Sequence, residues 1–282
     1  MTQFQKAVVA GTGTLALFCA EKLKAAGLPV TVCDMDQGTP GFLQRRTQSM
    51  EIPYFRPEPK LFFGELAKSD EHTLLISAIN PYIVPSYVLD NPKVIAINCH
   101  QALLPEHPGR NAEMWAIYEG DSKTGITWHM LTACVDGGDI LLQKEMEITE
   151  HHTAYQVFRE QIMLAQKGFE ELLPELLEGT LSPKPQEQRA NRKLHYSTDV
   201  PNQGQLDMGW EGRKISAFLR SMDYGILNVV PRPTVCIDGR TETVRKYKIT
   251  SEEKYEEGIR LEHDRLFIQK PGLLFELKLE KR

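Results

Sequence analysis

The chain has 282 residues, of which 41% are hydrophobic and 25% are charged. This balance is typical of a folded globular protein and argues against a long disordered region. The formal net charge of -5 provides no overall attraction to nucleic acid or to an anionic membrane.

The first residues and the cysteines predict a cytoplasmic protein. The start of the chain lacks the basic and apolar regions of a secretory signal. No stretch approaches the roughly 18 apolar residues of a transmembrane helix. The five cysteines are widely spaced and form no CxxC pair, a pattern typical of free thiols rather than of disulfides or a zinc site.

The first third of the chain alternates apolar strands with helix-length segments. Strands are predicted at 6–10, 29–33, 73–78 and 94–98, with helices over 15–25 and around 87–89. This alternation predicts a parallel sheet with crossover helices, and the continuous apolar runs indicate strands buried on both faces.

A different pattern follows Asn98. A helix is predicted at 112–118, strands at 126–131 and 140–147, and a long amphipathic helix at 153–177. Residues 182–204 are polar and contain prolines, which predicts a linker. The remainder combines a helix near 212–222 with short strand-like runs. We therefore predict an α/β protein with a Rossmann-like parallel-sheet domain at 1–181, a linker at 182–204 and a small β-rich C-terminal domain at 205–282.

The first candidate site is a GxGxxA motif from Gly11 to Ala16, placed between a strand and a helix. Together with Asp34 it is compatible with a dinucleotide fingerprint, in which backbone N–H groups hold a pyrophosphate. The alternative is that glycine only supplies a tight strand-to-helix turn. On its own, this motif is a weak signal.

A second candidate site is Asn98-Cys99-His100, at the end of a predicted parallel strand. Residues two apart on a strand face the same side, so Asn98 and His100 should face one pocket and Cys99 the opposite side. An asparagine amide can stabilise an oxyanion, and a histidine can transfer protons near neutral pH. The alternative is that His100 is a strand-end residue bonded to a loop carbonyl.

A third candidate is the acidic, glycine-rich turn from Val135 to Asp139. Asp136 or Asp139 could orient a histidine, and glycines allow a ligand to approach the backbone closely. The alternative is a simple hairpin turn, because Asp-Gly is a strong turn signal.

Taken together, these motifs resemble the folate-dependent formyltransferases, a family that includes methionyl-tRNA formyltransferase and the sugar N-formyltransferases. The resemblance rests on INCHQALLPEHPGRNAEMWAIYEGDSKTGITWHM and VDGGDILLQ, with Asn-x-His followed by an Asp-x-Gly turn. It implies catalysis by Asn98, His100 and Asp136. Asn98 would stabilise the oxyanion, His100 would move the proton, and Asp136 would orient His100, without a metal or a covalent intermediate.

The resemblance also implies 10-formyltetrahydrofolate as the formyl donor. Its pterin should contact the backbone of a segment after the third predicted strand and of a loop before Asp136, and an arginine should contact the folate. These cofactor-binding residues are Tyr82, Ile83, Val84, Arg110, Thr132, Ala133, Cys134 and Val135. His129 lies on a strand near the site, where a packed histidine is a more frequent role than a second base.

The acceptor is predicted to be a small-molecule amine: an amino sugar nucleotide, an amino acid or a peptide precursor. The stretch at 36–53, where tRNA-specific relatives carry a basic insertion, offers only Arg45 and Arg46, which argues against a nucleic-acid partner. Three alternatives stay open: a methionyl-tRNA formyltransferase, a nicotinamide-dependent oxidoreductase based on the glycine motif, and a scaffold that binds ligand without turnover. The sequence does not indicate an oligomeric state.

Overall fold

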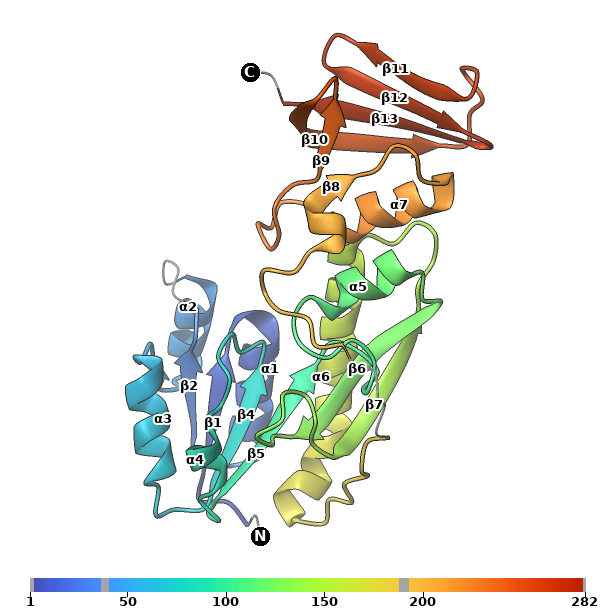
Figure 1. Cartoon of the computed structure of the whole chain (residues 1–282). Helices are drawn as coiled ribbons and strands as arrows, with labels where there is room; N and C mark the ends of the chain where they lie inside the picture. Colours follow the sequence, from blue (N-terminus) through green and yellow to red (C-terminus); the bar gives the residue numbers. More distant parts are fainter. Residues whose placement is uncertain (1–2, 37–40, 188–192, 281–282) are drawn as a thin grey trace. The chain divides into compact units, whose positions relative to one another are not determined.

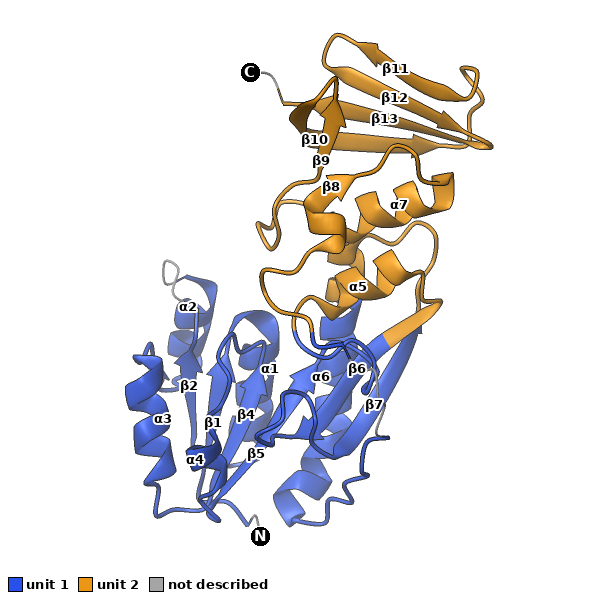
Figure 2. Ribbon diagram, in the orientation of Figure 1, with its two compact units in different colours: residues 1–109, 125–146, 160–194 blue, residues 110–124, 147–159, 195–282 orange. Residues whose placement is uncertain are grey.

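The computed structural model describes residues 3–36, 41–187 and 193–280. Contacts within the chain divide it into two compact units (Figure 2). The first unit comprises 1–109, 125–146 and 160–194, and the second comprises 110–124, 147–159 and 195–282. Each unit is therefore assembled from three separate segments. The predicted domain bounds, with a linker at 182–204, remain a prediction from the sequence.

The first unit is built around a seven-stranded sheet of order β3-β2-β1-β4-β5-β6-β7 (Figure 1). Its strands are β1 Lys6–Gly11, β2 Val30–Asp34, β3 Tyr54–Phe55, β4 Thr73–Ala78, β5 Val94–His100, β6 Lys123–Met130 and β7 Ile140–Glu147. Strands β1 to β5 all pair in parallel with their neighbours among these five, and β6 pairs antiparallel with β5. The predicted Rossmann-like sheet is confirmed, and β6 adds an antiparallel neighbour to it.

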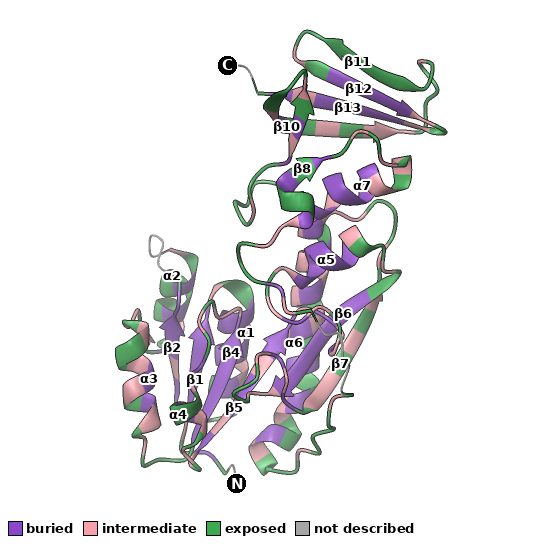
Figure 3. Cartoon of the chain, viewed as in Figure 1, coloured by how far each residue is buried: buried purple, intermediate pink, exposed green. Residues whose placement is uncertain are grey.

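Helices cover both faces of this sheet. Those that contribute to the first unit are α1 Gly13–Ala25, α2 Phe42–Ser49, α3 Pro59–Ala67, α4 Ser86–Leu89 and part of α6 Ala154–Glu178. Along β1, Ala7 and Val9 pack with α1 and α6 on one face, while Val8 and Ala10 pack with α3 and α4 on the other. This alternation explains why the central strands are apolar at nearly every position, as the buried colour of β1 and β4 shows (Figure 3).

The second unit contains a six-stranded sheet of order β11-β12-β13-β10-β9-β8. Its elements are α5 Ala112–Glu119, the 3-10 helix η1 Pro201–Gly204, β8 Gln205–Leu206, α7 Gly212–Ser221, β9 Thr234–Ile237, β10 Arg240–Thr250, β11 Gly258–Glu262, β12 Arg265–Lys270 and β13 Leu273–Leu279. Strands β8 and β9 are parallel, and the remaining neighbours are antiparallel. The β-rich character predicted for the C-terminal part is confirmed.

Helices α5 and α7 carry two polar contacts in the second unit, one buried and one partly buried. The Tyr224 hydroxyl donates a 2.6 Å hydrogen bond to Oε1 of Glu113, a side chain that is only 3% exposed. Lys214 of α7 donates through Nζ to the carbonyl of Tyr118 at 2.8 Å. These bonds connect α5 to α7 and to the loop that follows it.

The described part of the predicted linker makes specific contacts rather than running freely. Backbone hydrogen bonds join Lys184 to Ile140 at the start of β7, with N···O distances of 2.7 and 2.8 Å. In the part of the chain that the structure describes, no helix combines the length and apolarity that a membrane crossing requires.

Candidate active site

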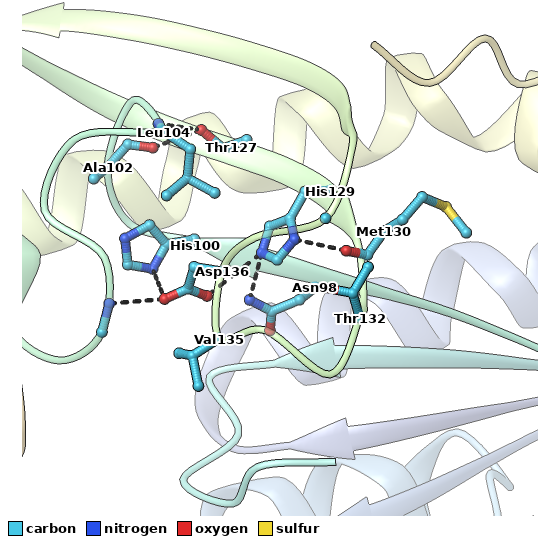
Figure 4. Close-up of polar contacts among 12 residues, drawn as sticks. Asn98, His100, Ala102, Leu104, Thr127, His129, Met130, Thr132, Val135 and Asp136 are labelled. Carbon is cyan, nitrogen blue, oxygen red and sulfur yellow. Dashed lines mark hydrogen bonds and ion pairs between the residues drawn. The ribbon is translucent and has the colours of Figure 1, made fainter. Parts of the chain in front are cut away.

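Strand β5 presents two polar side chains to the same side. Asn98 and His100 both lie next to the loop that carries Asp136 (Figure 4). Cys99, between them, is buried in the apolar core on the opposite face. The predicted alternation along the strand is therefore present, and it follows directly from the pleat of an extended backbone.

The Asp136 side chain lies between two histidines. Its Oδ2 is 3.5 Å from Nδ1 of His100, and its Oδ1 is 3.5 Å from Nε2 of His129 (Figure 4). Oδ2 also accepts a 2.8 Å hydrogen bond from the backbone N–H of Gly109. Asp136, His100 and His129 are all buried, so these charges and donors interact with little screening by water.

The surroundings of Asp136 favour its ionised form. Burial alone raises the pKa of a carboxyl group, because it removes the charge from water. Here the positive charge of His100, the neighbouring His129 and the Gly109 N–H outweigh burial and hold the pKa of Asp136 well below its usual range. The site therefore contains a fixed negative charge at neutral pH.

His100 is held from two sides. Its Nε2 is 2.8 Å from the carbonyl oxygen of His107, so Nε2 carries a hydrogen and donates it. Its Nδ1 faces Asp136. The bond to a loop carbonyl, which was the alternative interpretation of His100, is thus present together with the contact to Asp136.

His129 joins the site more closely than the sequence indicated. It is fully buried, its Nδ1 is 2.9 Å from the carbonyl of Met130, and its Nε2 is 3.1 Å from Nδ2 of Asn98 (Figure 4). A carbonyl only accepts, so Nδ1 carries a hydrogen, and Nε2 accepts from the Asn98 amide. The signal that identifies His129 is the antiparallel register, which places it directly opposite Asn98.

Three side chains hold the loop that follows His100. The Thr127 hydroxyl donates to the carbonyl of Ala102 at 2.7 Å and accepts from the N–H of Leu104 at 3.0 Å. Gln143 donates to the carbonyl of Leu104 and to Thr127 Oγ1, both at 2.9 Å. Gln161 donates to the carbonyls of Gln101 and Gly125 at 2.8 and 3.0 Å. None of these three side chains was predicted from the sequence to belong to the site.

The predicted folate-contacting segments have defined conformations in the first unit. Tyr82 donates its backbone N–H to Oδ1 of Asn80 at 3.0 Å, Ile83 is 71% exposed, and Val84 is buried in the core. Ile79, just before them, has a φ of 57°, which is rare for a β-branched residue and indicates strain at the end of β4.

The loop between β6 and β7 carries four further residues predicted to contact folate. Thr132 Oγ1 donates to the carbonyl of Cys134 at 3.1 Å, and Ala133 and Cys134 are exposed. Val135 directly precedes Asp136 and is partly buried. Arg110 begins the second unit, where its backbone N–H donates to the carbonyl of His195 at 2.9 Å. The folate-binding roles of these residues remain predictions.

The GxGxxA motif has a structural explanation. A Cβ atom on Gly11 would lie 1.8 Å from the carbonyl oxygen of Ala78, so only glycine allows β1 and β4 to approach this closely. Asp34 is buried, and its Oδ2 accepts a 2.6 Å hydrogen bond from the Tyr54 hydroxyl. Both features of the supposed fingerprint are therefore used within the chain itself.

The family follows from comparison with known proteins. Residues 18–173, more than half of the chain, match the family model described as formyl transferase. The chain belongs to the formyl transferase family. The prediction of a formyl-transferring enzyme is confirmed, and the oxidoreductase alternative is not supported.

The relatives of this formyl transferase include enzymes named for a sugar nucleotide and enzymes named for methionyl-tRNA. The chain is 27% identical over 243 residues to GDP-perosamine N-formyltransferase of Brucella melitensis. This alignment covers 83% of this chain and 90% of that protein. It is 34% identical over 179 residues to methionyl-tRNA formyltransferase of Geobacillus thermodenitrificans. This alignment covers 62% of this chain and 54% of that protein.

Solved structures show the same fold. WlaRD, a sugar 3N-formyl transferase solved in the presence of dTDP and 5-N-formyl-THF, has a TM-score of 0.78 and 15% identity over 99% of both chains. The N-formyltransferase from Helicobacter canadensis, solved with folinic acid and dTDP-3-aminofucose, also has a TM-score of 0.78, with 16% identity over 98% of this chain and 99% of that one.

Proposed function

We propose that this formyl transferase moves the formyl group of 10-formyltetrahydrofolate to the amino group of a nucleotide-linked amino sugar. The observation that carries the proposal is the buried, ionised Asp136 in contact with His100, with Asn98 beside them at the carboxyl end of β5. In open α/β sheets this end of the strands is where ligands bind.

We infer the following roles in the reaction. The acceptor amine attacks the formyl carbon on N10 of the folate, and the formyl oxygen becomes an oxyanion. One N–H of the Asn98 amide is directed to His129, and the other N–H of the same nitrogen stabilises the oxyanion. The oxyanion then collapses, and the bond between the formyl carbon and N10 breaks. His100 takes a proton from the attacking amine and gives it to N10. For this step its Nε2 leaves the His107 carbonyl, while Asp136 beside Nδ1 stabilises the charged ring.

For the donor, we propose that the pterin binds against backbone groups of two segments in the first unit. These segments are 82–84, after β4, and 132–135, before Asp136. The first segment follows β4, the parallel neighbour of β5, and the second follows β6, which carries His129. Two structural neighbours were solved with reduced folates, which supports a formyl-folate donor.

Two observations favour an amino sugar nucleotide over tRNA. A GDP-perosamine N-formyltransferase matches along 90% of its own length, whereas the matches to methionyl-tRNA formyltransferases extend along 54% to 68% of theirs. The net charge of -5 provides no general attraction to a polyanion. The five cysteines are free thiols, which fits the cytoplasmic location we propose.

A direct assay tests the proposed function. The purified protein would be incubated with 10-formyltetrahydrofolate and a panel of dTDP- and GDP-linked 3-amino and 4-amino sugars. Tetrahydrofolate release would be followed by absorbance, and the formylated sugar would be identified by mass spectrometry. The matching sugar nucleotides with a hydroxyl in place of the amine should give no product.

Variants connect the assay to the site. Asn98→Ala and Asp136→Asn should each lower kcat by roughly 100- to 10,000-fold, the range for the loss of a positioned donor or proton-transfer partner. Formylation of methionyl-tRNA without formylation of any amino sugar would overturn the proposed acceptor while leaving the donor intact.

A further inference from the structure

The turn that carries Asp136 is held by a side chain from another part of the chain. Nε2 of Gln186 lies 2.9 Å from the carbonyl oxygen of Asp136 and 2.6 Å from that of Gly138. Because a carbonyl oxygen only accepts, both contacts are donations, and they use both hydrogens of one amide nitrogen. Gln186 therefore holds the backbone on each side of Gly137.

Gln186 is itself well anchored. It lies two residues after Lys184, whose backbone exchanges two hydrogen bonds with Ile140 at the start of β7. The Gln186 side chain is half-buried. All of these residues belong to the first unit, so the stretch after α6 is fixed to the same sheet edge from which the Asp136 turn emerges.

The turn has a conformation that requires support. Asp136 has a φ of 48°, a left-handed conformation that costs a non-glycine residue about 1 to 2 kcal/mol. A Cβ on Gly138 would lie 1.8 Å from the carbonyl oxygen of Met130, and a Cβ on Gly137 would lie 2.7 Å from Sγ of Cys134. The turn is thus folded tightly against its own neighbours, and such strain persists only where surrounding contacts impose it.

Asp136 is consequently held both through its side chain and through its backbone. Its carboxylate contacts His100, His129 and the Gly109 N–H, while its carbonyl accepts from Gln186. The two carboxylate–histidine distances of 3.5 Å are long for hydrogen bonds. A small shift of the turn would therefore weaken both contacts, because neither has strong directional geometry to maintain it.

The same arrangement occurs at the loop that follows His100. There, Gln143 and Gln161 each direct one amide nitrogen to two oxygen acceptors. Gln186 performs the equivalent task on the Asp136 side of the site. Each of the two loops next to the reacting groups is thus secured by carboxamides from outside the loop.

We propose that Gln186 is a positioning residue that fixes the Asp136 carboxylate relative to His100 by holding the backbone of the turn. It acts through Asp136, by holding the turn that carries the carboxylate. The kinetic part of this inference rests on the proposed formyl transfer, whereas the structural part concerns the free protein alone.

Two variants separate the hydrogen bonds of Gln186 from its packing. Gln186→Met keeps the approximate volume and removes the amide, and Gln186→Glu keeps the shape and replaces both donors with acceptors. Both should lower kcat by roughly 10- to 100-fold, the scale expected for a small misplacement of a reacting group, with smaller changes in KM. The matched control is Gln269→Met: Gln269 also donates to backbone carbonyls, but in the sheet of the second unit, so kcat should be unchanged.

A measurement without turnover distinguishes failure of this inference from failure of the proposed function. The Asp136 carboxyl carbon would be followed by ¹³C NMR during pH titration of the free protein. Asp136 should titrate at higher pH in both Gln186 variants than in the wild type, and at the wild-type pH in Gln269→Met. Folded Gln186 variants with wild-type titration and wild-type kcat would overturn the role of Gln186. Absence of transfer by the wild type would overturn the proposed function, and the titration would still decide the role of Gln186.

Discussion

Asp136 illustrates how a buried carboxylate can remain ionised. Its side chain is removed from water, but each of its oxygens faces a histidine, and one also accepts a backbone N–H. Three partners from β5, β6 and the loop before α5 thus converge on one carboxylate. The charge is tolerated because partners replace the water that burial removes.

The first prediction concerns the pH dependence of stability. The pKa of Asp136 is lowered on folding, so its ionised form stabilises the folded state above the unfolded-state pKa of about 3.9. This stabilisation is lost as the pH falls through that value towards the lower folded-state pKa. Asp136→Asn should therefore unfold more easily than the wild type at pH 7, and the difference should shrink with acidification. Urea unfolding at a series of pH values measures the free energy of unfolding of both proteins. A difference between variant and wild type that stays constant with pH would contradict the prediction.

The second prediction concerns His129. Replacing it with phenylalanine keeps most of the buried volume but removes the acceptor for Asn98 and the partner of Asp136. We expect kcat to fall by about 10-fold or more, because the Asn98 amide loses its fixed orientation. His151, which has an 86% exposed side chain, provides the control, and His151→Phe should leave kcat unchanged. Equal kcat values for the two variants would exclude a role for His129.

At the scale of elements, the close approach of β1 to β4 determines the start of α1. Gly11 ends β1, and the N–H of Thr12 donates to the carbonyl of Ala78 at the end of β4. The strand pair is central in the sheet and buried on both faces. A side chain at Gly11 would therefore have to displace a central strand.

The third prediction follows from this approach. Gly11→Ala should destabilise the protein by about 3 kcal/mol or more, because its methyl group would overlap a backbone oxygen of β4. Gly13→Ala is the matched change in the same motif. Gly13 has a φ of 66° and open space around its Cβ position, so that variant should lose only about 1 kcal/mol, through backbone strain. Chemical denaturation measures both, and similar losses would rule out the steric explanation.

The fourth prediction concerns the contact between α5 and the loop after α7. Burial raises the pKa of Glu113, and the Tyr224 hydrogen bond and the charge of Arg110 offset this only in part. A raised folded-state pKa means that stability is present at low pH and is lost as the pH rises through that pKa. Glu113→Gln keeps an acceptor for Tyr224 without the charge, and should be more stable than the wild type at pH 8.

The matched change at this contact is Tyr224→Phe. It leaves the buried Oε1 of Glu113 without its donor and should cost about 1 to 3 kcal/mol at the same pH. Thermal unfolding at pH 8 and at pH 4 measures both variants. The gain of Glu113→Gln should shrink at the lower pH, and a gain of constant size would show that the charge of Glu113 is not its cause.

The sequence predicted the elements whose pattern is strong. Strands β1, β4 and β7 and helix α6 lie close to their predicted bounds, because continuous apolar runs and a long amphipathic period are unambiguous. Helices α2 and α3 were not predicted. Helix α2 buries only Leu43 and Thr47, and α3 has nine residues that start at Pro59, so neither carries a long periodic signal.

The site could be predicted only where local spacing determines it. Strand alternation places Asn98 and His100 on one side. The turn left Asp136 and Asp139 as alternatives, and the family resemblance selected Asp136. His129 and Gln186 depend on the register of β6 against β5 and on the return of the chain after α6. Pairings of this kind connect distant parts of the chain, and periodicity does not specify them.

At the scale of the whole molecule, net charge bears on the choice of acceptor. A tRNA-binding surface neutralises several phosphates and therefore shows affinity that falls steeply with salt. The net charge of -5 does not favour such a surface.

The fifth prediction is that the protein does not form a salt-dependent complex with tRNA. In the formyl-transfer assay, an excess of uncharged tRNA should leave the rate with an amino sugar nucleotide unchanged at low and at moderate ionic strength. Competitive inhibition by tRNA that weakens as salt is added would show that a polyanion uses the acceptor site.

Trp128 gives the sheet of the first unit a built-in spectroscopic reporter. It is one of three tryptophans in the chain, it is fully buried, and its indole N–H donates to the carbonyl of Ala165 at 3.0 Å. Its side chain packs in the apolar core between β6 and α6, on the face of the sheet opposite His129, while Trp115 and Trp210 belong to the second unit. Fluorine-labelled tryptophan should thus give three resonances, of which a single one senses how α6 packs on the sheet behind the site. Any change in this packing when a ligand binds could then be followed in real time from one peak, without a coupled enzyme.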